Sequence, residues 1–356
     1  MTHLSRRQLL EGSAALGVLG AGLFTSRAAC ADSTAQWAAR PPAGFVPFTA
    51  PGKIVKVTAA GDLVATMQLN QLFPKPEVAK QLVERAMMEF TGAPSLVEAM
   101  KKFIHRDDLV AIKVNGIGGQ HGYSMATNYE VILPVVEAVL GVGVPPEHVV
   151  VYEQYTGFLQ ATRSNVGKWK LPPGVRTDSH NNKVMGTPPI TIYQGIKSRF
   201  CSTLVQATAV INMPLIKDHG GAGYTGALKN MTHGNIDNPQ GHHAHRSSPQ
   251  IALLYNQAVI KSRVRLHITD AFKMLCDGGP LDKNPRGRLL HGSIYVSTDP
   301  VALDVVGAKL VNERRKEKGY PTLEAGQREP TYIRIAGELG LGVADPNLIQ
   351  LKSLEI

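Results

Sequence analysis

Residues 209–246 read AVINMPLIKDHGGAGYTGALKNMTHGNIDNPQGHHAHR, and both the fold and the candidate site are organised around this stretch. Its apolar start, Ala209–Ile211, predicts the end of a buried strand that begins near Leu204 and stops before Pro214. The remainder is rich in glycine, lysine and histidine. Because charged groups and histidines are costly to bury without partners, this segment either lines a cleft or is a solvated loop.

Outward from this stretch, strand patterns alternate with helical patterns. The predicted strands cover residues 53–58, 109–114, 148–152, 264–269, 292–297 and 348–351. The predicted helices cover residues 76–90, 95–104, 127–140, 248–261, 300–315 and 330–339. Most of the strands are continuous apolar runs, which are typical of strands buried on both faces. The sequence therefore predicts an α/β fold with a largely parallel sheet and helices on both faces.

Polar residues follow five of the predicted strands. These residues are Asn115, Glu153, Asn212, Asp270 and Asp299. Ligands of open α/β sheets bind at the carboxyl ends of the strands. We therefore expect Asn115, Asn212, Asp270 and Asp299 to surround one cleft at that edge.

Three motifs of the chain resemble the signature of a family defined as a domain of unknown function, DUF362. The motifs are Ile211–Pro214 with Lys217, His219 and Thr225–Asn230; Ile268–Asp270 with Gly278–Pro280; and Asp299–Asp304. The resemblance covers roughly residues 105 to 310, most of the chain. Many members of that family carry cysteine-rich iron–sulfur segments, whereas this chain has none, so an iron–sulfur cluster is not expected.

The glycines of the central stretch predict a binding loop. Gly221, Gly223 and Gly226 have the spacing of a dinucleotide fingerprint, but nine residues separate them from the preceding strand. We therefore favour an anion-cradling loop, in which backbone N–H groups act together with Lys217 and Lys229. Asn115 and Asn212 at the neighbouring strand ends complete the predicted cofactor-binding set. The alternative is a flexible surface loop whose lysines are solvated.

The histidines of the same stretch suggest a transition-metal site of unknown identity. The candidate ligands are His219, His233, His242, His243, His245 and Asp270. Imidazole is a common ligand of zinc, copper, iron and nickel, although this spacing matches no standard motif. A polar loop that happens to hold histidines is the alternative interpretation.

Four residues are candidates for catalysis. His219 can serve as an acid, a base or a ligand, and Lys217 can hold an anion. Lys113 lies within an apolar strand, and His121 lies in the glycine-rich loop after it. Either Lys113 or His121 could act as a general base if burial shifts its pKa.

The N-terminus has the features of a targeting segment. Ser5–Leu10 contains a twin-arginine pattern, and an apolar run and small residues follow it. We expect residues 1–31 to be a twin-arginine signal peptide, residues 32–52 a linker or wrapping arm, and residues 53–356 an α/β domain, with or without two subdomains. The expected partner is the twin-arginine export machinery, the expected location is periplasmic or secreted, and no permanent membrane anchor is expected.

Charge and cysteine content narrow the function classes. The formal net charge is +10, and it falls to +8 without residues 1–31, which carry three arginines and one glutamate. No nucleic-acid motif accompanies this charge, so attraction for anionic ligands or cell-envelope polymers is the milder inference. Cys201 and Cys276 could pair or remain free thiols. Three functions stay open: a metal- or cofactor-dependent enzyme acting on a small anionic substrate, a periplasmic binding protein for a phosphorylated or carboxylated solute, and a maturation factor for an exported redox complex.

Overall fold

The computed structural model describes residues 34–119, 125–181 and 183–356. The predicted signal peptide and His121 lie outside these residues. Within the described ranges, no helix is long and apolar enough to cross a membrane. Residues 34–52 run along the domain, where Thr34 bonds to Gln257 and the N–H of Phe48 bonds to the carbonyl of Lys102.

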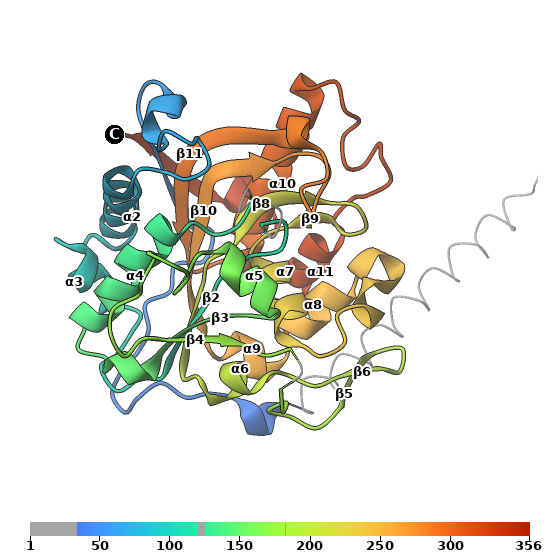
Figure 1. Ribbon diagram of the computed structural model, residues 1–356. Helices are drawn as coiled ribbons and strands as arrows, with labels where there is room; N and C mark the ends of the chain where they lie inside the picture. Colours follow the sequence, from blue (N-terminus) through green and yellow to red (C-terminus); the bar gives the residue numbers. More distant parts are fainter. Residues whose placement is uncertain (1–33, 120–124, 182) are drawn as a thin grey trace, which may run out of the picture.

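One large sheet runs through the molecule, in the strand order β12-β1-β11-β10-β7-β2-β3-β4 (Figure 1). The parallel part of this order consists of β10 (Val264–Leu275), β7 (Ala209–Asn212), β2 (Val110–Lys113), β3 (Val149–Glu153) and β4 (Arg176–Ser179). All residues of β2, β3 and β7 are buried, as their apolar sequences require. The α/β fold with a largely parallel sheet and helices on both faces is confirmed.

The rest of the order mixes directions. β11 (Arg288–Ser297) is antiparallel to β10 and to β1 (Lys53–Thr58), whereas β12 (Gln350–Glu355) is parallel to β1. Because β11 runs opposite to β10, its carboxyl end lies at the other edge of the sheet. The expectation that Asp299 joins a common cleft is therefore wrong. Asp299 instead accepts hydrogen bonds from the N–H groups of Val301 and Ala302 and begins the following helix.

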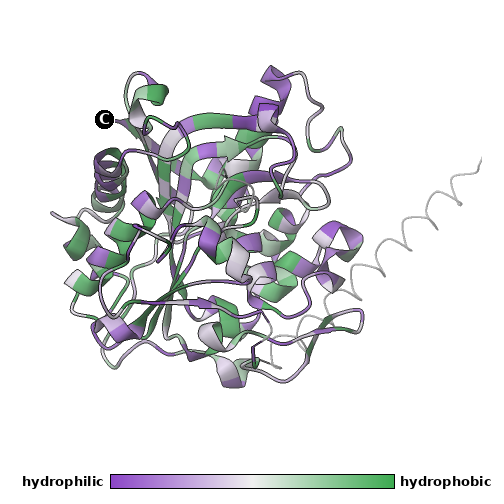
Figure 2. Ribbon diagram, viewed as in Figure 1, coloured by the Kyte–Doolittle hydropathy of each residue, from purple (hydrophilic) through white to green (hydrophobic). Residues whose placement is uncertain are grey.

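Helices cover both faces of the sheet, each over its own apolar core (Figure 1). One face carries α2 (Pro76–Thr91), α3 (Leu96–Met100) and α4 (Tyr129–Gly141). The other carries α6 (Ser202–Gln206), α7 (Ala227–Thr232), α8 (Gln250–Tyr255), α9 (Ala258–Lys261), α10 (Pro300–Glu317) and α11 (Tyr332–Glu338). Figure 2 shows α2 with polar residues on its outer side and apolar residues toward the sheet, the pattern of an amphipathic helix.

The central stretch folds differently from its predicted form. Leu204 lies in α6, so β7 begins later than expected, at Ala209. After Pro214 the chain forms a hairpin of β8 (Leu215–His219) and β9 (Gly223–Thr225), and β8 also pairs with the extended β10.

Smaller elements complete the domain. They are α5 (Thr156–Ala161), the two-stranded sheet of β5 (Ile190–Tyr193) and β6 (Ile196–Ser198), and 3₁₀ helices at Ala35–Trp37, Leu63–Thr66, Pro146–His148, His233–Asn235, Gly241–Ser247, Pro285–Gly287 and Pro346–Leu348. Cys201 and Cys276 are both buried free thiols, which answers the question of their pairing.

Candidate functional site

A cleft of about 420 Å³ opens at the carboxyl ends of β2 and β3, beside α7. The sequence-predicted residues that line it are Lys113, Asn115, His219, Lys229, His233 and His243. Its other walls include Glu153 at the end of β3, the following residues Gln154, Tyr155 and Phe158, and Thr225 and Asn230. Two strand ends, one helix and the segment around His243 thus converge on one cavity.

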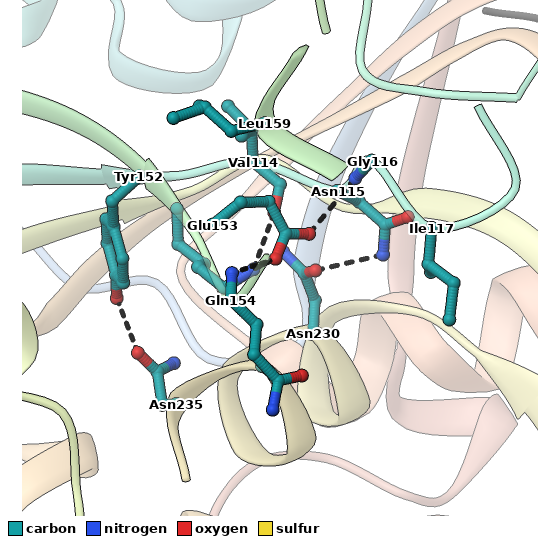
Figure 3. A network of polar contacts seen from close by, with 12 residues as sticks. Val114, Asn115, Gly116, Ile117, Tyr152, Glu153, Gln154, Leu159, Asn230 and Asn235 are labelled. Atoms are coloured by element: carbon teal, nitrogen blue, oxygen red, sulfur yellow. Dashed lines mark hydrogen bonds and ion pairs between the residues drawn. The ribbon is translucent and has the colours of Figure 1, made fainter. Parts of the chain in front are cut away.

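Lys113 and Glu153 form a buried ion pair at the floor of this cleft. The Lys113 amine lies 3.2 Å from the Glu153 carboxylate, and their side chains are 1% and 4% exposed. Glu153 also accepts hydrogen bonds from the N–H groups of Gly116 and Gln154 (Figure 3). Burial lowers the pKa of Lys113, whereas the nearby Glu153 raises it. The two charges therefore neutralise each other, and the ion pair joins the ends of β2 and β3.

A chain of amides connects the strand ends to α7. Lys217 donates to the side-chain oxygen of Asn115 at 2.7 Å, and Asn115 donates to Asn230 at 3.0 Å (Figure 3 shows the Asn115–Asn230 bond). Asn230 in turn donates to Asn212 at 2.7 Å, and Asn212 donates to the carbonyl of Ala227 at 2.9 Å. This network holds α7 over the sheet. Burial lowers the pKa of the Lys217 amine to about 7.

Lys229 projects from α7 into the cleft. Its amine lies 3.4 Å from Nε2 of His243. Burial lowers the pKa of Lys229 to about 7. A lysine with this pKa is a free amine in about half of the molecules at neutral pH, so it can accept a proton as well as donate one.

Three histidines surround this amine. The ring of His243 lies 5.4 Å from that of His219 and 4.7 Å from that of His233, between centroids. Burial lowers the pKa of His219 to about 2 and that of His243 to about 4, so both rings are neutral at pH 7.

The hydrogen bonds of two rings define their tautomers. Nδ1 of His219 accepts from the N–H groups of Gly221 and Ala222, at 3.0 and 2.9 Å. The neutral His219 ring therefore carries its proton on Nε2 and acts as a donor. Nδ1 of His243 lies 2.7 Å from the carbonyl of Pro239, to which it donates. Nε2 of His243 consequently presents a lone pair.

Comparison with protein families matches residues 110–309 to the model of a domain of unknown function, DUF362. The chain belongs to this family. The matched residues include the three motifs that carry the resemblance and all the polar groups described above. No match is found among curated proteins.

The DUF362 motif at Asp299–Asp304 has a structural explanation. Its first aspartate begins α10, and its last, Asp304, accepts hydrogen bonds from the N–H groups of Ala227 and Leu228 at 2.6 and 3.2 Å. These N–H groups form the first turn of α7, the helix that bears Lys229. Asp304 thus caps α7 from a neighbouring helix and positions that lysine.

The glycine-rich segment of this DUF362 chain is a hairpin turn, and its predicted role as an anion cradle is not supported. The N–H of Gly221 is bonded to His219. A Cβ on Gly223 would lie 1.8 Å from the carbonyl oxygen of Arg328, and one on Gly226 would lie 2.3 Å from Asp304. These glycines therefore allow close packing of the backbone, and none of the three lines the cleft.

The six predicted metal ligands do not assemble. Among the described residues, no group of three or more His, Cys, Asp or Glu side chains is arranged to hold a metal ion. Asp270 accepts from the backbone and side chain of Asn128, and His245 contacts Gln194 at the surface. His242 contacts Ser198. His219 carries a proton on its free nitrogen, so this tautomer offers no lone pair to a metal there.

Some residues that form the site have no role predicted from the sequence. The sequence indicates Glu153 only as a strand-end residue and Asn230 only as part of a motif. Thr225 lines the cleft and its buried hydroxyl has no hydrogen-bond partner in the described structure. Asn212, in contrast, lies beneath the cleft and contacts His267 and Asn230. The signal available for Glu153 was its place at a strand end, the same signal that indicated Asn115.

Proposed function

We propose that the protein is an exported enzyme that binds a small anionic substrate in this cleft and moves protons with Lys229 and His243. The observation that carries the proposal is a buried amine in the wall of the cleft without a counter-ion. Lys113 has Glu153 as a partner, whereas Lys229, which also lines the cleft, has no ion pair with a carboxylate among the described residues. Buried amines without counter-ions favour an anionic ligand, which supplies the missing charge.

The roles of the side chains follow from their hydrogen bonds. Lys217 does not itself line the cleft; it donates to the side chain of Asn115, which does, and to the carbonyl of Ile117. The Nε2–H of His219 is a neutral donor suited to an oxygen that gains negative charge. Lys229 and His243 are 3.4 Å apart and can pass a proton between them.

Titration of anionic probes tests the binding part of this proposal. Inorganic phosphate and succinate would be titrated calorimetrically against wild type and Lys229→Met. A lost charge-assisted hydrogen bond should weaken binding roughly tenfold to hundredfold. Lys273→Met is a matched control, because Lys273 is also buried but donates to the carbonyl of Leu72 outside the cleft.

Three results would decide the matter. Weaker binding in Lys229→Met and wild-type affinity in Lys273→Met would support the site. Equal affinity in all three proteins would contradict it, as would the absence of binding by wild type. Melting temperatures of the variants confirm that each one is folded.

Export through the twin-arginine route is the second part of the proposal and is supported by the sequence of residues 5–31. We predict that Arg6→Lys with Arg7→Lys keeps the protein inside the cell, because the arginine pair is read as an address. Arg27→Lys, which leaves the pair intact, should be exported normally. Cell fractionation measures the location of both variants, and periplasmic accumulation of the double variant would contradict this prediction.

A further inference from the structure

Lys229 differs from the other buried lysines of the described chain. Those are Lys113, Lys217 and Lys273, and each donates to at least one oxygen atom. The hydrogen bond found for Lys229 is to the imidazole nitrogen of His243. An ammonium group gains most from oxygen acceptors, so this environment favours the free amine. The amine also faces a cavity, where a ligand can approach it.

His243 is oriented to take a proton from this amine. Its Nδ1–H is held by the carbonyl of Pro239 at 2.7 Å, so the lone pair of Nε2 is directed to the side of Lys229. An amine next to a hydrogen-bond acceptor of this kind has the arrangement of an activated nucleophile.

Two further groups can hold the oxygen atoms of a substrate. The hydroxyl of Thr225, a residue 4% exposed, has no partner in the described structure although the residue lines the cleft. The Nε2–H of His219 is a neutral donor, and its ring stacks near that of His243. A buried unpaired hydroxyl is costly, so its presence in the wall of the same cleft independently points to a ligand oxygen.

We propose that Lys229 forms an imine with the carbonyl carbon of a small oxoacid, an inference that rests on the proposed function. The Nζ lone pair forms the N–C bond while the carbonyl π electrons move to oxygen, and one Nζ proton passes through His243 to that oxygen. The second Nζ proton then joins the hydroxyl as the C–O bond breaks. One water leaves, the C=N bond forms, and no oxidant or reductant is consumed.

The cleft also favours the acid group of such a substrate. Lys113 lines the cleft with its charge offset by Glu153, and the Lys217 amine lies behind Asn115, another residue of the cleft wall. Positive charge from Lys217 near the cleft suits one carboxylate, and the lowered pKa of Lys229 keeps its amine nucleophilic while that carboxylate is bound.

Reductive trapping tests this inference. The mature protein would be incubated at neutral pH with pyruvate, glyoxylate or 2-oxoglutarate and with borohydride, and then analysed by intact mass and peptide mapping. We expect one adduct per chain at Lys229, with at least one of the three oxoacids. The adduct should be absent in Lys229→Met and retained in Lys273→Met.

A second variant keeps the test valid if Lys229→Met fails to fold. His243→Gln retains the amine but removes the base, so trapping should slow by roughly tenfold to hundredfold and its pH profile should move. No adduct with any of the oxoacids, or equal labelling in Lys229→Met, would overturn the inference. Succinate has no reactive carbonyl, so its binding reports on the proposed function alone. Lysine-dependent succinate binding without an adduct would therefore leave the anion site standing and remove the imine.

Discussion

Buried charges in two regions of this molecule are treated in opposite ways. Near the start of β2, Arg265 donates to both carboxylate oxygens of Asp108 at 2.6 and 3.0 Å. Beside α4, Arg163 donates to both oxygens of Glu130 at 2.8 and 2.6 Å. In the cleft, Lys229 contacts a neutral imidazole instead. The two arginines that stabilise the fold have carboxylate partners. The Lys229 amine has no carboxylate partner among the described residues and remains available to a ligand.

The largest expected effect comes from breaking a paired charge. Asp108→Ala leaves Arg265 buried without its carboxylate, which should lower the free energy of unfolding by about 3–5 kcal/mol. Urea denaturation measures this loss. Glu98→Ala removes one partner of the exposed pair Lys101–Glu98 and should cost less than about 1 kcal/mol. Similar costs for the two variants would show that burial of the pair contributes little.

The second effect should have the opposite sign. Lys229→Met removes an amine whose charged form is disfavoured by burial, so stability at pH 7 should rise, by at most about 4 kcal/mol. The same variant should lose anion binding. Thermal melts and succinate titrations on one preparation measure both quantities. A large loss of stability would show that Lys229, like Arg265 and Arg163, stabilises the fold.

Much of the fold could be predicted from sequence, but strand direction could not. β1 covers the same residues, 53–58, as its predicted strand, and β2 and β3 begin and end within a residue of theirs, because apolar runs bounded by polar residues have clear ends. Nothing in the residues of β11 distinguishes an antiparallel from a parallel strand. Asp299 was therefore placed at the wrong edge of the sheet.

The candidate site was predictable in composition and only partly in arrangement. A run of lysine and histidine at a strand end indicated where a cleft would form, and Lys229, His219 and His243 do line it. Ligation depends on which ring nitrogen is free, and that depends on backbone partners such as the N–H groups that hold His219. The pairing of Lys113 with Glu153 joins residues of two strands and depends equally on the fold.

Two buried histidines, one in the cleft and one outside it, allow a comparison with a smaller expected effect. Burial lowers the pKa of both His219, in the cleft, and His267, outside it, to about 2 and about 3. As the pH falls below 6.5, each of these histidines takes up a proton in the unfolded chain but not in the folded protein. Each one therefore lowers the free energy of unfolding, by about 1–2 kcal/mol at pH 5. Histidine NMR at pH 7 should show that succinate shifts the ring resonances of His219 and leaves those of His267 unchanged. Equal shifts at both rings would mean that the anion does not bind in the cleft.

The smallest effect concerns two buried threonines with different surroundings. Thr127 accepts from the N–H of Asn115 and donates to the carbonyl of Met213 at 3.0 Å, so Thr127→Val should cost about 1–3 kcal/mol of stability. The hydroxyl of Thr225 has no such bonds within the described structure, and Thr225→Val should leave stability unchanged or slightly higher. It should still weaken oxoacid binding by about 0.5–1.5 kcal/mol, the value of a neutral hydrogen bond to a ligand oxygen. Denaturation and calorimetry on both variants test the pair. If Thr225→Val destabilised the protein as much as Thr127→Val does and left binding intact, the unpaired hydroxyl would belong to the fold and not to the ligand.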